Sequence, residues 1–176
     1  RTFPTMDAPW APPGKYTIRL TAGGKRYEQP LTLRLDPRVT TPAAGLAQLA
    51  SLSTEMYDNA VAARAAYTRA RALRERLGSG AAQASALAAR VDALAPAKPD
   101  SGADNSRNSQ RTDASAPPTL KSVGDQLMAA AMAMQGADIA PTANQIAACR
   151  RASNAYRAVM SQWSALEKQA RSVAEA

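Results

Sequence analysis

The chain has 176 residues, of which 45% are apolar and only 5% aromatic, and alanine is the main apolar residue. This composition is sufficient for a hydrophobic core, and it favours closely packed helices over a protein built only from β-sheets. The sequence has no histidine and one cysteine, which excludes an internal disulfide and the common histidine-dependent zinc, haem and catalytic-triad sites.

The formal net charge of +8 comes from 22 Lys and Arg residues against 14 Asp and Glu residues. Such an excess suits an anionic partner only where the charges gather on one face. No apolar run approaches the roughly 20 residues of a membrane-spanning helix, and no signal peptide opens the chain. Because the chain begins at Arg1 and not at Met, we expect it to belong to a longer polypeptide with any targeting signal upstream.

Residues 1–40 predict a β-hairpin after an extended, proline-rich lead-in over residues 1–14. Alternating apolar residues predict two strands, with one face of each formed by Tyr16, Ile18 and Leu20 and by Tyr27, Leu31, Leu33 and Leu35. If Gly23-Gly24 form a two-residue turn with positive φ at both positions, Leu20 pairs with Tyr27 and Tyr16 with Leu31. The two apolar faces then coincide.

Two residues of this segment need a special environment. Pro30 would delete a ladder hydrogen bond unless it lies at an edge or a bulge, and a lone hairpin is marginal in water. We therefore expect further strands upstream. Trp10 is expected to cover either the hairpin or the junction with the helices, and Pro37 ends the sheet because it disfavours helical geometry at Asp36.

Residues 41–176 predict four helices, separated by Gly78, Pro96 and Gly136. The first begins with Thr41 as N-cap and Pro42 in the first turn, and the others cover about residues 81–95, 119–135 and 143–174. Each presents a seam of apolar or small residues at helical spacing. The seams are Leu46, Leu49, Leu52, Met56, Ala60, Ala63, Tyr67, Ala70, Leu73 and Leu77; Ala84, Leu87, Val91 and Leu94; Leu120, Val123, Leu127, Ala131 and Met134; and Ile146, Cys149, Tyr156, Val159 or Met160, Trp163, Leu166, Ala170 and Val173.

Helix lengths predict how these segments pack. At 1.5 Å per residue the first and fourth helices span roughly 54 and 50 Å, and the second and third about 22 and 25 Å. Residues 96–118 contain no apolar residue larger than alanine and are expected to form a flexible loop. The sequence therefore predicts a mainly α fold, an antiparallel three-rod helical bundle whose middle rod is split by this loop.

The candidate anion-binding residues are arginines that cluster on the first helix and form a stripe on the fourth. They are Arg64, Arg69, Arg71, Arg74, Arg76, Arg150 and Arg157, and Arg171 continues the stripe. None occupies a seam position, so the alternative interpretation is an ordinary solvated helix face. The aromatic residues between them, Tyr67 and Tyr156, occupy seam positions and not the arginine faces. No nucleic-acid-binding motif is present, so no nucleic-acid partner is expected.

Cys149 and Trp163 occupy seam positions of the fourth helix. We expect Cys149 to be a small buried hydrophobe, with a reactive thiol beside Arg150 and Arg151 as the alternative. Trp163 is expected to anchor the core and not to bind a ligand.

No catalytic constellation is apparent. Glu55 and Asp58 lie one turn apart on the outer side of a helix, and this is not the converging carboxylate pair of a glycosidase. Gly23-Gly24 lacks the following helix and lysine of a P-loop. We therefore predict no catalytic residue, cofactor site or metal site in this chain.

Four segments carry a resemblance to a known family. They are Pro13-Gly-Lys-Tyr-Thr-Ile-Arg-Leu20; Gln29-Pro-Leu-Thr-Leu-Arg-Leu-Asp-Pro-Arg38, followed by a helix containing residues 46–57; Asp138-Ile-Ala-Pro-Thr142; and Trp163-Ser-Ala-Leu166. Together they resemble the C-terminal tail of bacterial sortilin-type β-propeller proteins, which carry BNR-like repeats and are often labelled glycosyl hydrolases.

The resemblance implies that residues 1–40 are closing strands of an immunoglobulin-like module and that residues 41–176 are a helical appendage. It also implies an exported bacterial protein, periplasmic or secreted. Any active site of the family is expected in the propeller, which this chain does not contain, so no residue role is transferred.

The expected function is a non-catalytic structural or interaction module that packs against a β-propeller of the same polypeptide. Self-association through the helices is a further option. Two alternatives remain open. One is a basic helical scaffold that binds an anionic polymer or a membrane surface. The other is a residue contributed to the active site of a neighbouring propeller.

Overall fold

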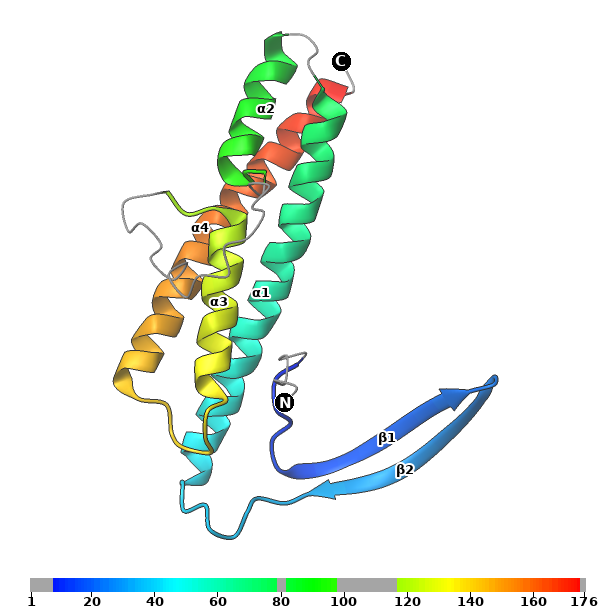
Figure 1. Ribbon diagram of the computed structural model, residues 1–176, viewed down its shortest axis with the longest axis vertical. Coiled ribbons are helices and arrows are strands. Elements are labelled where there is room, and N and C mark those ends of the chain that lie inside the picture. The colour runs from blue at the N-terminus through cyan, green and yellow to red at the C-terminus, as the bar shows by residue number, and fades with distance from the viewer. Residues whose placement is uncertain (1–7, 79–81, 98–116, 175–176) are drawn as a thin grey trace, which may run out of the picture.

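A computed structural model describes residues 8–78, 82–97 and 117–174. Within these ranges the protein is mainly helical, with four helices and one two-stranded antiparallel hairpin (Figure 1). Residues 1–7 of the predicted lead-in, residues 98–116 of the predicted flexible loop and the side chain of Val173 lie outside the described residues.

The order of the elements is the predicted one. They are β1 (Gly14–Ala22), β2 (Lys25–Leu33), α1 (Ala43–Leu77), α2 (Ala82–Leu94), α3 (Leu120–Met134) and α4 (Ala143–Ala174). Each helix lies within a residue or two of its predicted bounds, because capping residues, glycines and prolines mark the ends locally.

The hairpin adopts the predicted register. Leu20 pairs with Tyr27 and Tyr16 with Leu31. Gly23 and Gly24 turn the chain with φ values of 55° and 74°. A two-residue turn with positive φ at both positions favours glycine and matches the twist of the two strands, so the turn sets the register.

Pro30 is accommodated because of its place in this register, opposite Thr17. Pairs in an antiparallel ladder alternate between hydrogen-bonded and non-hydrogen-bonded, and the two-residue turn makes Ala22–Lys25 a hydrogen-bonded pair. Counting from there, Thr17–Pro30 is a non-hydrogen-bonded pair. The missing N–H of Pro30 therefore lies on the outer edge of β2 and removes no bond between the strands.

The helices pack in an up, down, down, up order. Figure 1 shows the chain rising along α1, descending along α2 and then α3, and rising again along α4. The short helices α2 and α3 lie beside different halves of the long ones, and both contact α1 and α4. The hairpin projects from the end of the helical part at which α1 begins.

The core lies along the predicted seams. Four alanines of α1 are fully buried, namely Ala60, Ala63, Ala66 and Ala70. The large buried side chains opposite them come mainly from α3 and α4: Leu120, Leu127, Met134, Val159, Trp163 and Leu166. Small residues on one helix allow its neighbours to approach closely. Among the described residues of the predicted helices, the buried ones that the predicted seams missed are Ser53, Ala66, Ala88, Ala95, Gly124, Ala152 and Ser153.

The start of α1 differs from the prediction. Pro42, and not Thr41, is the N-cap residue, and no side chain caps the helix. The Thr41 hydroxyl instead donates a 2.6 Å hydrogen bond to the Asp138 carbonyl. Thr41 therefore fixes the start of α1 to the turn between α3 and α4.

Trp10 lies at the junction of the hairpin and the helices. It lines a small cavity of about 80 Å³ together with Pro12, Leu35, Leu46 and Leu49. Of the two expected positions for Trp10, the structure supports the junction.

Two glycines provide a matched test of the helix contacts. A Cβ atom at Gly45 would lie only 2.8 Å from Ala140 Cβ, whereas one at Gly124 would meet Ala63 Cβ at 3.5 Å, an ordinary contact. We expect Gly124→Ala to raise the free energy of unfolding by roughly 0.5–1 kcal/mol through helix propensity. Gly45→Ala should lower it by about 1 kcal/mol or more, because overpacking outweighs propensity. Urea denaturation followed by circular dichroism measures both, and a shift in the same direction for the two variants would contradict the close approach at Gly45.

Candidate functional site

The seven candidate arginines do not form one surface. On α1, Arg69 and Arg76 are seven residues apart and share one face, whereas Arg64, Arg71 and Arg74 point to another. The ion pairs agree with this division, because Arg69 reaches α4 while Arg71 and Arg74 reach α2. Arg150 and Arg157 lie exposed on α4.

Arg71 and Arg74 share one carboxylate on α2. Arg71 donates to Asp92 Oδ1 at 2.7 Å and to the Ala95 carbonyl at 3.1 Å, and Arg74 donates to Asp92 Oδ2 at 2.6 Å. The hydrogen bond from Arg74 is the main cause that lowers the pKa of Asp92, and partial burial opposes it. These two arginines therefore attach α2 to α1.

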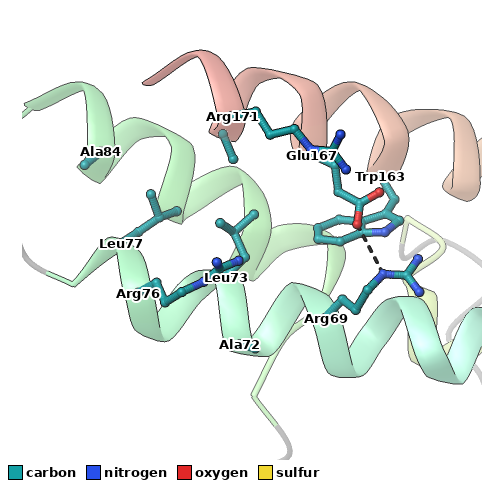
Figure 2. A pocket seen from close by; sticks show the side chains of 10 residues that line it. Arg69, Ala72, Leu73, Arg76, Leu77, Ala84, Trp163, Glu167 and Arg171 are labelled. Carbon is teal, nitrogen blue, oxygen red and sulfur yellow. Dashed lines mark hydrogen bonds and ion pairs between the residues drawn. The ribbon is translucent and has the colours of Figure 1, made fainter. Parts of the chain in front are cut away.

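A cavity of about 630 Å³ lies at the end of the helical part where α1 ends and α2 begins (Figure 2). Three helices line it. Its apolar lining consists of Ala72, Leu73, Leu77, Ala84, Ala170 and the ring of Trp163, and its charged lining consists of Arg69, Arg76, Glu167 and Arg171. Arg69 Nε and Glu167 Oε1 form an ion pair of 3.2 Å across the cavity wall. The structure thus brings two of the predicted arginines, Arg69 and Arg76, to one site.

Trp163 has two structural roles. Its side chain is 1% exposed, which confirms that it anchors the core. Its ring also forms a wall of the cavity (Figure 2). The indole Nε1 is buried and has no hydrogen-bond acceptor among the described residues.

Cys149 is a buried free thiol, as expected from its seam position. Burial, and secondarily the charge of Glu55, raises the pKa of the Cys149 thiol above its usual value, so it is protonated at neutral pH. Arg150 and Arg151 are exposed and do not reverse this effect. Glu55 itself accepts a 2.8 Å hydrogen bond from Ser153, which provides a partner for this buried serine.

The hairpin exposes a large apolar face. Ile18, Leu20 and Tyr27 are 52%, 59% and 55% exposed, and Leu31 on the same face is 38% exposed. The opposite face is polar and carries an Arg19–Glu28 ion pair of 2.7 Å. The helices therefore leave the apolar side of this amphipathic hairpin uncovered.

Within the described ranges, no cluster of three or more His, Cys, Asp or Glu side chains could hold a metal ion. None of the described helices is both long enough and apolar enough to cross a membrane. No family model matches the chain, and neither the curated proteins nor the solved structures contain a significant match to it.

Removal of the Asp92 carboxylate tests its role between α1 and α2. A lowered pKa means that Asp92 stabilises the fold above the unfolded-state pKa of about 3.9 and that this stabilisation is lost as the pH falls through the folded-state pKa. We expect Asp92→Asn to lower the free energy of unfolding at pH 7 by up to about 1 kcal/mol, since the carboxylate is partly solvent-screened. The difference from the unmodified chain should disappear on acidification.

Asp125→Asn is the matched control, because Asp125 forms an exposed ion pair with Lys121 within α3. It should cost no more than about 0.5 kcal/mol. Urea denaturation between pH 3 and 7 gives both values, and a pH-independent loss in Asp92→Asn would contradict the assignment.

Proposed function

We propose that this chain is a non-catalytic interaction module whose hairpin docks on a β-sheet domain. The exposed apolar face of the hairpin supports this proposal. A two-stranded hairpin has little stability of its own in water, and folded proteins rarely leave a contiguous apolar face uncovered. A partner sheet that covers Ile18, Leu20 and Tyr27 removes both difficulties.

The hairpin has two outer edges, and they differ in their capacity to pair. The outward-facing backbone groups of β1 belong to Lys15, Thr17, Arg19 and Thr21, which occupy non-hydrogen-bonded pairs. The corresponding position on β2 includes Pro30, which has no N–H to donate. A partner strand can therefore form an uninterrupted ladder with β1 but not with β2, so we place the partner beside β1.

The resemblance to the tail of sortilin-type β-propeller proteins makes a β-domain of the same polypeptide the proposed partner. Under this proposal residues 1–40 are the last strands of an immunoglobulin-like module in a periplasmic or secreted protein. The helices form a three-rod bundle that extends from it. Binding of an anionic polymer is the less favoured function, because Asp92 and Glu167 already pair with three of the candidate arginines.

Independent folding of the helical part tests the proposed division of the chain. Residues 41–176 expressed alone should give a helical circular dichroism spectrum and a cooperative thermal transition, because the buried core residues all come from the helices or the residues directly beside them. The complete chain is the control. A random-coil spectrum for residues 41–176 would rule out an independent bundle.

Docking through the edge of β1 is tested with two proline variants. Arg19 and Glu28 are cross-strand partners, so Arg19→Pro and Glu28→Pro remove the same ion pair and place proline in the same non-hydrogen-bonded pair. They differ only in the outer edge that is blocked. In a longer polypeptide that carries the proposed β-domain, we expect the outward amides of Thr17 and Thr21 to exchange hydrogen at least about tenfold more slowly than in this chain alone.

Arg19→Pro should abolish this protection, and Glu28→Pro should retain it. Hydrogen exchange with mass spectrometry makes the measurement. Equal protection in both variants, or no added protection in the longer polypeptide, would exclude docking at β1.

A further inference from the structure

The cavity between α1, α2 and α4 combines an apolar interior with an excess of positive charge. Three arginines and one glutamate line it, a net charge of +2. Glu167 neutralises Arg69, but Arg76 and Arg171 form no ion pair within the part of the chain that the structure describes. The guanidinium groups of Arg76 and Arg171 therefore line this site without an ion-pair partner among the described residues.

The other basic face of α1 is different. Arg71 and Arg74 are held by Asp92, with Arg71 also bonded to the Ala95 carbonyl, so their charge is used to attach α2. Among the described residues, neither Arg76 nor Arg171 pairs with a carboxylate in this way. Their charge is available for a ligand.

We propose that this cavity binds a small amphiphilic carboxylate. Its apolar chain would pack on the partly exposed side chains of Leu77, Ala84 and Ala170, beside the almost fully buried ring of Trp163. Its carboxylate would accept hydrogen bonds from Arg76 and Arg171. These two side chains come from opposite walls, α1 and α4 (Figure 2). Guanidinium groups are well matched to carboxylates because they donate two parallel hydrogen bonds.

The size and the polarity of the cavity agree with this class of ligand. Its volume of about 630 Å³ lies within the range of roughly 300–1,000 Å³ that is typical of small-molecule sites. A neutral chain of the same length would gain only the apolar contacts. A cationic amphiphile would meet two unpaired guanidinium groups, so the site should select for a negative head group.

Trp163 provides a local signal for binding. Because the only other tryptophan, Trp10, lies at the hairpin junction at the other end of the helices, Trp10→Phe gives a chain that reports on the cavity alone. Octanoate is the probe, and octanamide is its neutral equivalent. We expect a saturable change in Trp163 emission with octanoate, with a Kd at or below about 1 mM.

Calorimetric titration of the same samples should give the same Kd. Octanamide should bind at least about tenfold more weakly, because the charge-assisted hydrogen bonds are lost.

Two double variants with the same change in net charge locate the site. Arg76→Gln with Arg171→Gln should raise the Kd for octanoate about tenfold or more. Arg150→Gln with Arg157→Gln, on the same helix as Arg171 but about 20 Å or more from it, should change the Kd less than about twofold. All four positions are exposed, so the fold should be retained, as thermal unfolding would verify.

Ala170→Leu is a test that leaves the charges unchanged, because the larger side chain fills part of the cavity and should weaken binding. The proposal is overturned by any of three results. These are no saturable signal up to about 10 mM octanoate, equal affinity for octanamide, and equal effects of the two double variants.

Discussion

The alanine seam of α1 is the constraint on which the rest of the fold depends. Ala60, Ala63, Ala66 and Ala70 have small side chains and no exposed surface, so the neighbouring helices lie close to the α1 backbone. Each methyl group has a small apolar area, so its burial stabilises the fold by only on the order of 0.8 kcal/mol. The larger contributions come from α3 and α4, where Leu127 and Trp163 are almost completely buried. α1 therefore contributes small side chains to this part of the core, and its neighbours contribute the large ones.

The same seam determines what the arginines of α1 can do. Because the seam occupies one side of α1, its charged residues flank the seam and extend towards different neighbours. Arg71 and Arg74 reach α2, and Arg69 reaches Glu167 on α4. A cluster that is continuous in the sequence thus becomes two separate faces. The face with Arg71 and Arg74 attaches α2 to α1, and the face with Arg69 and Arg76 borders the cavity.

Local signals in the sequence predict the elements well and their long-range contacts poorly. The helix bounds and the register of the hairpin follow from glycine, proline and the spacing of apolar residues, all of which act over a few positions. Thr41 illustrates the limit. Its sequence context indicates an N-cap. Its hydroxyl instead donates its hydrogen bond to the carbonyl of Asp138, 97 residues away, and does not cap the helix.

The cavity shows the same limit. The seven-residue spacing of Arg69 and Arg76 already indicates that they share a face, and that signal could have separated them from Arg71 and Arg74. No sequence pattern indicates that Arg171 and Trp163 lie opposite them, because that depends on how α4 packs against α1. The exposure of the hairpin face is equally invisible in the sequence, since an alternating pattern predicts a half-buried strand but not what buries it.

The distance between the two proposed binding sites limits how they can influence each other. The hairpin projects from the end where α1 begins, and the cavity lies where α1 ends (Figure 1). The 35 residues of α1 separate these ends by roughly 50 Å at 1.5 Å per residue. A carboxylate in the cavity and a sheet docked on β1 therefore cannot touch. Any coupling between them would need a second arrangement of α1 against its neighbours, and the fully buried alanine seam resists such a shift because every displacement opens space beside close-packed backbones. α1 is then a rigid spacer that separates the cavity from the hairpin end of the helices.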